Sequence, residues 1–182
     1  MLKNRIENPM LRGIVEWLIA IAFAALLFFV VRSFLFRVAH VNGNSMEPTL
    51  SHGDMVVLNR LSYLFSVPRV DDIVAFPFAE NPSEFYIKRV IAVPGDMVDL
   101  QNGVFLINGI PLVDDFSLEP IVSFGDIRFP TTIEAGHFFV LGDNRNASMD
   151  SRFASVGNVP ARDMVGRVAV RIFPFNRLGG VD

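Results

Sequence analysis

The 182-residue chain contains no cysteine. Cysteine supplies disulfides, thiolate zinc ligands and one class of nucleophile, so the sequence excludes all three. The three histidines, His40, His52 and His137, each lack a second ligand three to five residues downstream, which is the spacing of zinc sites. Residues 143–150 superficially resemble a calcium loop, but Arg145 stands where a ligand is needed. We therefore expect no metal and no cofactor.

An excess of basic charge is also missing. Sixteen Lys and Arg residues are outnumbered by nineteen Asp and Glu residues, which gives a formal net charge of -3. Proteins that bind nucleic acid carry a basic patch that neutralises phosphates, and here the basic residues form no run. A glycine-rich phosphate loop is absent as well. The sequence predicts that nucleic acid is not a partner.

Long hydrophobic runs are limited to one, the fifteen apolar residues from Trp17 to Val31. A helix that spans a bilayer needs about twenty residues, and residues 14–36 provide them with Glu16 and Arg32 near the ends. The eighteen phenylalanines and the mean hydropathy of +0.40 also favour partial residence in lipid. We predict a cytoplasmic tail over residues 1–13 and one transmembrane helix over residues 14–36.

A cleaved secretion signal is the alternative interpretation of this run. Ala22-Phe23-Ala24 fits a small-x-small cleavage site, but it lies in the middle of the apolar residues, so a retained anchor is favoured. The basic residues of the tail favour a cytoplasmic N-terminus, although Arg32 and Arg37 on the other side reduce this bias. The expected location is the cytoplasmic (inner) membrane, crossed once, with the remaining chain on the extracytoplasmic side.

After Val38 the sequence changes to short apolar runs separated by turn residues, which is typical of an all-β domain. Asn102-Gly103 and Asn108-Gly109 are hairpin turn signals, since both central positions of a type I′ turn need positive φ. We expect residues 97–135 to form a small β-meander arm inserted into a β core of residues 37–96 and 136–182. The predicted strands are Met55–Leu58, Ile73–Phe76, Phe85–Val93, Val104–Ile107, Phe138–Leu141 and Val165–Phe173.

Ser45 is the candidate nucleophile. It lies in the polar segment from Gly43 to Leu50, shortly after the apolar run, and a serine hydroxyl needs a positioned base at neutral pH. The segment lacks the second glycine of a nucleophile elbow. A Ser-His-Asp triad stays open, because its members can come from anywhere in a fold.

Lys88 is the candidate base. In the strand Phe85–Val93, alternation places Tyr86, Lys88 and Val90 on one face. Burial of such an apolar strand would disfavour the ammonium form and lower the pKa of the amine. The more common alternative is that Lys88 and Arg89 are solvated charges on an edge strand, and the segment alone leaves both interpretations open.

The polar segment from Asn144 to Arg152 follows an apolar strand directly. Functional groups concentrate on loops that a rigid strand positions. By composition alone, however, Asp150 and Arg152 read as an ordinary surface ion pair.

Four motifs follow the predicted anchor: Ser45 to Leu50, Val70 to Phe76, Tyr86 to Val90 with Val93 to Asp96, and Gly142 to Arg145 with Ser148 to Arg152. Together, and in this order, they resemble the motifs of the type I signal peptidases of bacteria. In the second motif, Val70-Asp71 replaces the family's usual Arg-Gly.

The resemblance implies antiparallel sheets in a coiled, partly barrel-like catalytic domain. It also implies a catalytic Ser/Lys dyad, with Ser45 as nucleophile and Lys88 as general base. Ser148 would hydrogen-bond to Lys88 and orient it, and Asp150 and Arg152 would form an ion pair that holds the loop.

The oxyanion site departs from the family pattern. Many members carry a serine two residues before the nucleophile, where this chain has Gly43. Backbone N–H groups, particularly that of Ser45, would then bind the oxyanion, and the second donor is unassigned.

The implied reaction is removal of signal peptides from secretory preproteins, with cleavage after small residues. Substrate pockets would be lined by Val41, Met46, Tyr86 and Ile87. The implied partners are the preproteins, the lipid bilayer and, by proximity, the secretion translocon. Residues 61–67 are explained equally by contact with lipid and by core packing.

Two other functional classes stay open at this point. A self-cleaving repressor-type peptidase would use a similar dyad, but it has no use for the anchor over residues 14–36. A catalytically silent, membrane-tethered β-rich module that binds proteins would share fold and anchor, but it leaves Ser45, Lys88 and Ser148 unexplained.

Overall fold

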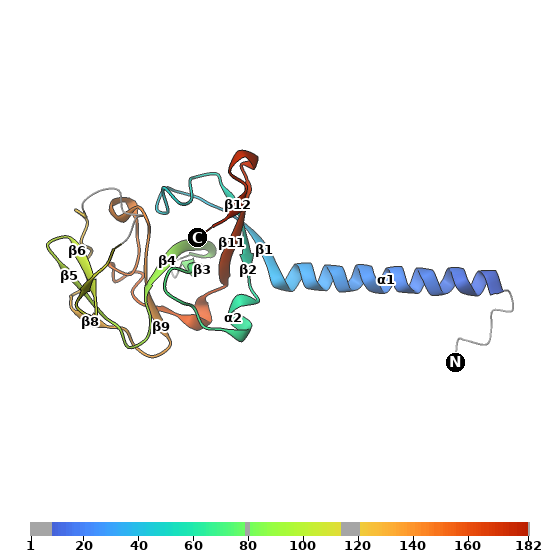
Figure 1. Ribbon diagram of the computed structural model, residues 1–182, viewed down its shortest axis with the longest axis horizontal. Coiled ribbons are helices and arrows are strands. Elements are labelled where there is room, and N and C mark those ends of the chain that lie inside the picture. The colour runs from blue at the N-terminus through green and yellow to red at the C-terminus, as the bar shows by residue number, and fades with distance from the viewer. Residues whose placement is uncertain (1–8, 79–80, 114–120, 182) are drawn as a thin grey trace. The chain divides into compact units, whose positions relative to one another are not determined.

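The computed structural model describes residues 9–78, 81–113 and 121–181 (Figure 1). The chain divides into two compact units, residues 1–37 and residues 38–182, and each is treated by itself. Most of the predicted tail, residues 1–8, and part of the predicted arm, residues 114–120, lie outside the described residues.

From residue 9 on, where the structure describes it, the first unit contains one helix, α1 (Pro9–Leu35). Its segment Pro9–Val30 has a mean hydropathy of 2.5 and is long and apolar enough to cross a membrane, with none of it buried in protein. The helix begins earlier than the predicted residue 14, since Pro9 takes a first-turn position where its missing N–H costs nothing. It ends at Leu35 because Phe36 already belongs to a strand.

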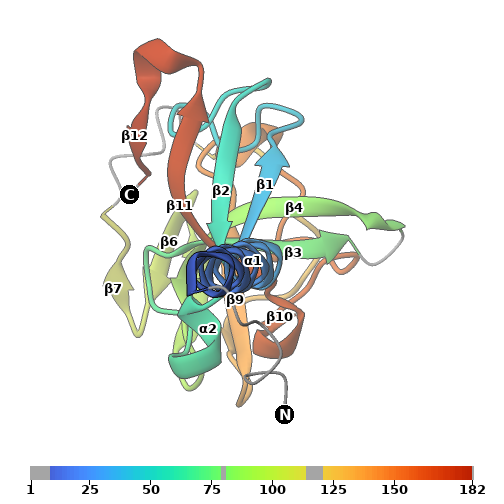
Figure 2. The ribbon, with the colours of Figure 1, turned by 90° about the vertical axis from the view of Figure 1, so that its right-hand side faces the viewer.

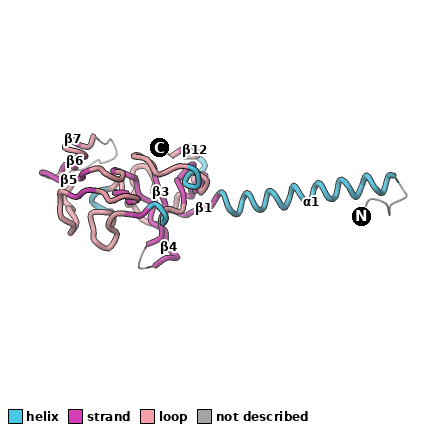
Figure 3. The backbone as a smooth tube through the Cα atoms, turned by 90° about the horizontal axis from the view of Figure 1, so that it is seen from below, coloured by secondary structure: helices cyan, strands magenta, loops and turns pink. Residues whose placement is uncertain are grey.

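The second unit is mainly β, which confirms the predicted fold class. Strand and loop dominate it, and α2 (Ser62–Phe65) is a single helical turn (Figure 3). The larger sheet has the order β1-β2-β11-β3-β4-β9-β10, with β12 paired to β11. Its strands are β1 (Phe36–His40), β2 (Met55–Asn59), β3 (Ile73–Phe78), β4 (Asn81–Ala92), β9 (His137–Leu141), β10 (Val159–Pro160), β11 (Gly166–Phe173) and β12 (Gly179–Gly180).

The position of β4 in this sheet matters most for the site. β4 pairs with β3 along most of its length and with β9 from Arg89 to Ala92, both antiparallel. In the same sheet β2 lies between β1 and β11 (Figure 2). β4 is therefore an interior strand. It begins at Asn81, four positions before the predicted start at Phe85.

The smaller sheet has the order β7-β6-β5-β8 and lies apart from β2 and β11 (Figure 1). Asn102-Gly103 and Asn108-Gly109 all have positive φ, as the hairpin turns require. Three consecutive strands form a meander, and β8 returns to pair with the other side of β5. The strands are β5 (Met97–Gln101), β6 (Val104–Ile107), β7 (Ile110–Pro111) and β8 (Thr131–Thr132).

Three phenylalanines join the two sheets. Phe105 on β6, Phe139 on β9 and Phe129 have ring centroids 5.9 to 6.2 Å apart in edge-to-face contact. Phe105 and Phe139 are almost completely buried. Such rings bury large apolar areas, so this cluster couples the arm to the strand that precedes the polar segment 142–152.

Phe139→Ala should lower the free energy of unfolding by about 3–5 kcal/mol, because it removes the central ring and leaves a cavity. Denaturant unfolding in detergent would measure the change. Phe175→Ala is the matched control, since Phe175 is 79% exposed and its loss should change stability by less than about 0.5 kcal/mol. Equal effects of the two substitutions would contradict the coupling role of the cluster.

Candidate active site

Lys88 lies on β4, where its register partner on β3 is Val74. Its exposed fraction is 3%, and that of Arg89 is 1%. The interpretation of these residues as solvated edge charges is therefore wrong, because β4 has neighbours on both sides. An amine that the sheet removes from water is the first element of the site.

Burial lowers the pKa of Lys88 to about 8, since the ammonium loses its hydration. The carboxylates of Asp150 and Asp143 oppose this shift, and the guanidinium of Arg152 adds to it. At pH 7 about a tenth of the molecules would carry a neutral amine, against far fewer for an ordinary lysine. The amine can therefore accept a proton near neutral pH.

Two contacts orient the Lys88 amine. Nζ donates a hydrogen bond to the carbonyl oxygen of Ile87 at 3.1 Å. The same nitrogen lies 5.0 Å from the centroid of the Tyr86 ring, and that ring is stacked on Phe78 with centroids 4.6 Å apart. These neighbours limit the directions in which the lone pair of a neutral amine can point.

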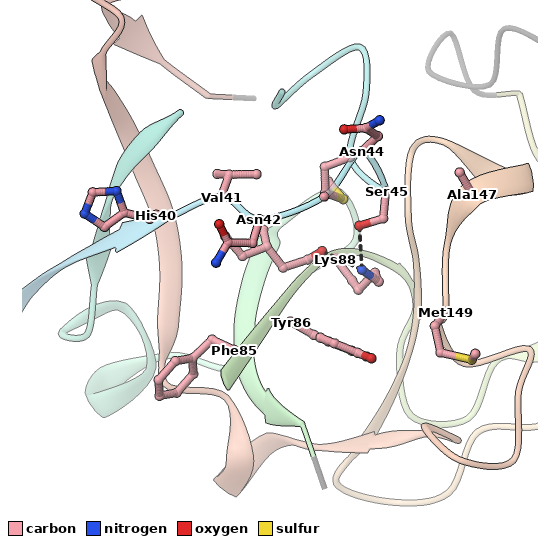
Figure 4. A pocket seen from close by; sticks show the side chains of 13 residues that line it. His40, Val41, Asn42, Asn44, Ser45, Phe85, Tyr86, Lys88, Ala147 and Met149 are labelled. Carbon is pink, nitrogen blue, oxygen red and sulfur yellow. Dashed lines mark hydrogen bonds between the residues drawn. The ribbon is translucent and has the colours of Figure 1, made fainter. Parts of the chain in front are cut away.

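Ser45 comes from the loop between β1 and β2, and it meets Lys88 across 43 residues of sequence. Lys88 Nζ and Ser45 Oγ are 2.8 Å apart, and the two side chains point toward one another in Figure 4. No histidine of the described chain hydrogen-bonds to Ser45. The geometry favours a lysine over the Ser-His-Asp alternative as the proton acceptor.

The backbone before Ser45 has a specific conformation. Gly43 has φ +95°, a region that L side chains rarely adopt, and its N–H donates to Nδ1 of His52 at 3.2 Å. At the base of the loop, Val41 and Asp54 are joined by a backbone hydrogen bond of 2.9 Å. Ser45 is thus presented by a closed loop.

The segment after β9 approaches Ser45 from the other side. Asn144 N donates to the Ser45 carbonyl oxygen at 3.0 Å, and Gly142 N donates to Asp150 Oδ2 at 3.1 Å. A Cβ atom at Gly142 would overlap both the Ser45 carbonyl oxygen and Ser148 Oγ. Only glycine allows the two segments to come this close.

Asp150 and Arg152 form an ion pair that is completely buried, with N···O distances of 2.8 and 2.9 Å. The predicted pair is therefore present, but it is not the surface pair that composition suggests. Arg152 also donates to the carbonyl oxygens of Ser123, Arg145 and Ser148. One guanidinium satisfies several buried acceptors and holds the loop in a single arrangement.

Ser148 lies beside Gly142 with 8% exposure, and its Oγ has no hydrogen-bond partner within the described chain. The hydrogen bond from Ser148 to Lys88 that the resemblance implies is therefore not made in this structure. Buried hydroxyl groups without a hydrogen-bond partner are uncommon in proteins, so the Ser148 hydroxyl is a candidate functional group.

The sequence reasoning missed a second buried pair, Arg89 with Asp143. Both guanidinium–carboxylate distances are 2.9 Å, and both side chains are buried. Thr49 Oγ donates to Asp143 at 2.5 Å, so the pair also contacts the serine loop. The alternation of side chains along the strand does place Arg89 on the face opposite Lys88. It cannot identify Asp143, 54 residues away, as the partner of Arg89.

A cleft of about 170 Å³ opens beside the Ser45 and Lys88 side chains (Figure 4). All four predicted pocket residues, Val41, Met46, Tyr86 and Ile87, line it. Val41, Met46 and Ile87 are buried and supply an apolar part of the wall, which polar groups complete. Lining residues that the sequence reasoning missed are His40, Asn42, Phe85, Ala147 and Met149.

Known proteins share this sequence pattern. A family model described as signal peptidase, peptidase S26, matches residues 14–173. The signal peptidase I of Leptolyngbya laminosa is 38% identical over 181 residues, which is 95% of this chain and 84% of that protein. The signal peptidase I of Bacillus caldolyticus is 35% identical over 173 residues, 88% of this chain and 90% of that protein.

A solved structure, the signal peptidase I of Enterococcus faecalis V583, is 30% identical with a TM-score of 0.49, and the match covers 57% of this chain and 98% of that one. On the family match and the identities to its relatives, the chain is a hydrolase that belongs to the signal peptidase family, peptidase S26. Several of its relatives in that family are type I signal peptidases, so the resemblance predicted from four motifs is confirmed.

Gly142→Ala should reduce peptidase activity by at least about 100-fold, because the added Cβ displaces the Ser45 backbone and a shift of about 1 Å costs that much. The rate of hydrolysis of a peptide with small residues before the scissile bond would measure the loss. Gly180→Ala is the control, since nothing lies within 4 Å of its Cβ position. Parental activity in Gly142→Ala would show that the close approach is dispensable.

Proposed function

We propose that this chain is a membrane-anchored serine endopeptidase that removes N-terminal signal peptides from secretory preproteins. Ser45 is the nucleophile and Lys88 the general base. The observation that carries the proposal is the 2.8 Å contact between Ser45 Oγ and the amine of a buried lysine. Membership of the signal peptidase family supports the substrate class.

The dyad performs acyl transfer in two steps. Neutral Lys88 takes the proton of Ser45 Oγ while the oxygen bonds to the carbonyl carbon of the substrate. The ammonium then gives this proton to the leaving amine as the C–N bond breaks, which leaves an acyl-enzyme. Lys88, neutral again, activates a water molecule that hydrolyses the ester and restores Ser45.

The developing oxyanion needs a donor at the serine loop. The Ser45 N–H has no acceptor among the residues that the structure describes, so it is available. The Gly43 N–H is already bound to His52 Nδ1, and Gly43 has no side chain to replace the serine of other family members. We infer that Ser45 N–H is the main donor.

Three residues support the dyad in this proposal. Ser148 Oγ, which is buried without a partner in the described chain, is available to orient the Lys88 amine. Asp150 and Arg152 hold the loop that carries it. Their charges act on the Lys88 pKa in opposite directions, and the Asp150 carboxylate raises it more than the Arg152 guanidinium lowers it.

The substrate lies extended along the cleft in this proposal, with its backbone near Val41 and Ile87. The buried apolar side chains of Met46 and Ile87 in the cleft wall would contact apolar side chains of the substrate. Cleavage after alanine-sized residues is part of the proposal.

The helix α1 provides the anchor, with the β unit on the extracytoplasmic side near the secretion translocon. Holding enzyme and preprotein in one bilayer raises their effective concentration. Leu64, Phe65 and Val67 are 67%, 88% and 70% exposed, so core packing does not explain them and contact with lipid remains the better account.

Ser45→Ala and Lys88→Ala should each lower preprotein processing by at least about a thousandfold, because residues of a dyad act as a unit. Purified protein in detergent would be incubated with a preprotein, and the shortened product measured. Ser155→Ala is the control, since Ser155 is exposed and lies outside the cleft. Equal processing by parent and variants would exclude the dyad, and no processing by the parent would favour a silent binding module.

Activity should rise with pH through about 8, because the base must be neutral and burial lowers the Lys88 pKa from 10.5 to about 8. Below that value kcat/KM should fall about tenfold per pH unit. Lys3 and Lys88 are the only lysines, so NMR of the ¹³C-methylated amines would assign the titration directly. A flat profile between about pH 6 and 9, or a Lys88 amine that titrates near its ordinary value, would contradict this role.

A further inference from the structure

The serine loop, residues 42–53, connects β1 to β2 without a strand of its own. It must nevertheless keep Ser45 Oγ at 2.8 Å from Lys88. On the side of the β9 segment it is held by Asn144 N and by the Thr49 hydroxyl on Asp143. The loop also contacts β11 and the turn that follows it.

Arg171, on β11, makes three hydrogen bonds there. Its Nη1 donates to the Thr49 carbonyl oxygen at 2.9 Å and to Asp54 Oδ2 at 3.0 Å. Its Nε donates to the Arg177 carbonyl oxygen at 2.8 Å. The Arg171 side chain is only 14% exposed, so these bonds form largely away from water.

Arg177, in the turn η3 (Phe175–Arg177), reaches the same loop. Its Nη1 donates to Ser51 Oγ at 3.0 Å and its Nη2 to the Pro48 carbonyl oxygen at 3.4 Å. Asp54 lies 3.8 Å from Arg177 and accepts from Ser51 N at 3.0 Å. The buried carboxylate therefore sits between two guanidinium groups and the loop backbone.

We propose that Arg171 and Arg177 are positioning residues for the nucleophile, an inference that rests on the proposed function. Neither contacts Ser45 or Lys88. They act through the carbonyl groups of Pro48 and Thr49, three and four residues after Ser45.

The restraint on Pro48 and Thr49 reaches Ser45 because hydrogen-bonded turns connect these residues within the loop. Glu47 N donates to the Asn44 carbonyl oxygen and Leu50 N to the Met46 carbonyl oxygen, so the residues on both sides of Ser45 are bonded to the held segment. A movement at Thr49 therefore moves Ser45. Reaction rates depend steeply on such displacements, with about 100-fold lost per 1 Å.

Thr49 is fixed at two points. Its carbonyl oxygen accepts from Arg171, while its hydroxyl donates to Asp143, the partner of Arg89 next to Lys88 in β4. Arg171 of β11 thus holds the carbonyl group of Thr49, and Asp143, the partner of Arg89 on β4, holds its hydroxyl. This arrangement fixes the serine loop relative to the strand that carries Lys88.

The geometry requires arginine rather than any cation. Arg171 uses two different nitrogens in a fixed planar fork to reach the loop, Asp54 and the η3 backbone. A lysine at position 171 would keep the positive charge beside Asp54 but could not make the same set of hydrogen bonds. Arg171→Lys therefore separates the effect of the charge from the effect of positioning the loop.

The test compares Arg171→Lys, Arg171→Met and Arg177→Met with Arg167→Met in the preprotein assay. Arg167 is the matched control, because it is an arginine of the same strand whose ion pair with Asp72, at 3.2 Å, lies away from the loop. We expect kcat to fall about 100-fold in Arg171→Met and about tenfold in the other two, with KM within about twofold, since Tyr86 and Ile87 on β4 are unchanged. Arg167→Met should keep the parental kcat.

Thermal unfolding separates positioning from stability. Arg171→Lys and Arg177→Met keep a cation beside Asp54, so they should unfold near the parental temperature even if Arg171→Met does not fold. Parental kcat in both variants, or a kcat loss no larger than that of Arg167→Met at equal unfolding temperature, would overturn the inference. In either case an active parent enzyme leaves the proposed function standing, whereas an inactive parent refutes that function itself.

Discussion

The removal of one amine from water is the constraint on which the rest of the site depends. Lys88 lies on an interior strand, where hydration no longer stabilises the ammonium, and its pKa falls to about 8. The same burial costs folding free energy whenever the amine is charged. A fold can keep such a residue only if neighbouring groups satisfy its hydrogen bonds, and the Ile87 carbonyl and Ser45 hydroxyl do so.

Three arginine–carboxylate pairs, two of them almost completely buried, hold the segments that build the site, and each fixes a different segment. Arg89 with Asp143 contacts the serine loop through Thr49, Arg152 with Asp150 holds the loop after β9, and Arg171 with Asp54 holds the back of the serine loop. Buried pairs contribute little net stability, but losing one partner leaves an unpaired charge in a medium of low dielectric. Any arrangement of these loops that separates a pair is therefore strongly disfavoured. The loops keep one conformation, and the 2.8 Å contact between Ser45 and Lys88 requires this.

Sequence reasoning identified the serine and the lysine that the structure places 2.8 Å apart, and four residues of the cleft wall, because motif order and strand alternation carry that information. Alternation correctly assigned Tyr86 and Lys88 to one face of β4. It could not find Asp143 or Arg171, whose partners are 54 and 117 residues away, since facing direction says nothing about which strands become neighbours. Two-residue strands such as β12 are too short to show a period. The Ser148 hydrogen bond shows the limit of resemblance, since the residue is in place but its hydroxyl makes no bond among the described residues.

The proposed lysine base would also explain why the site needs so few groups. A histidine has two nitrogens, and a third residue must fix the tautomer before it can accept a proton. An amine takes and returns the proton at a single nitrogen, so only the direction of its lone pair must be set. The Ile87 carbonyl and the Tyr86 ring constrain that direction for Lys88. Its basicity then depends on the packing of β4 between β3 and β9 rather than on one neighbour. A substitution that admits water beside β4 would therefore raise the Lys88 pKa and lower activity at neutral pH without touching either reacting residue.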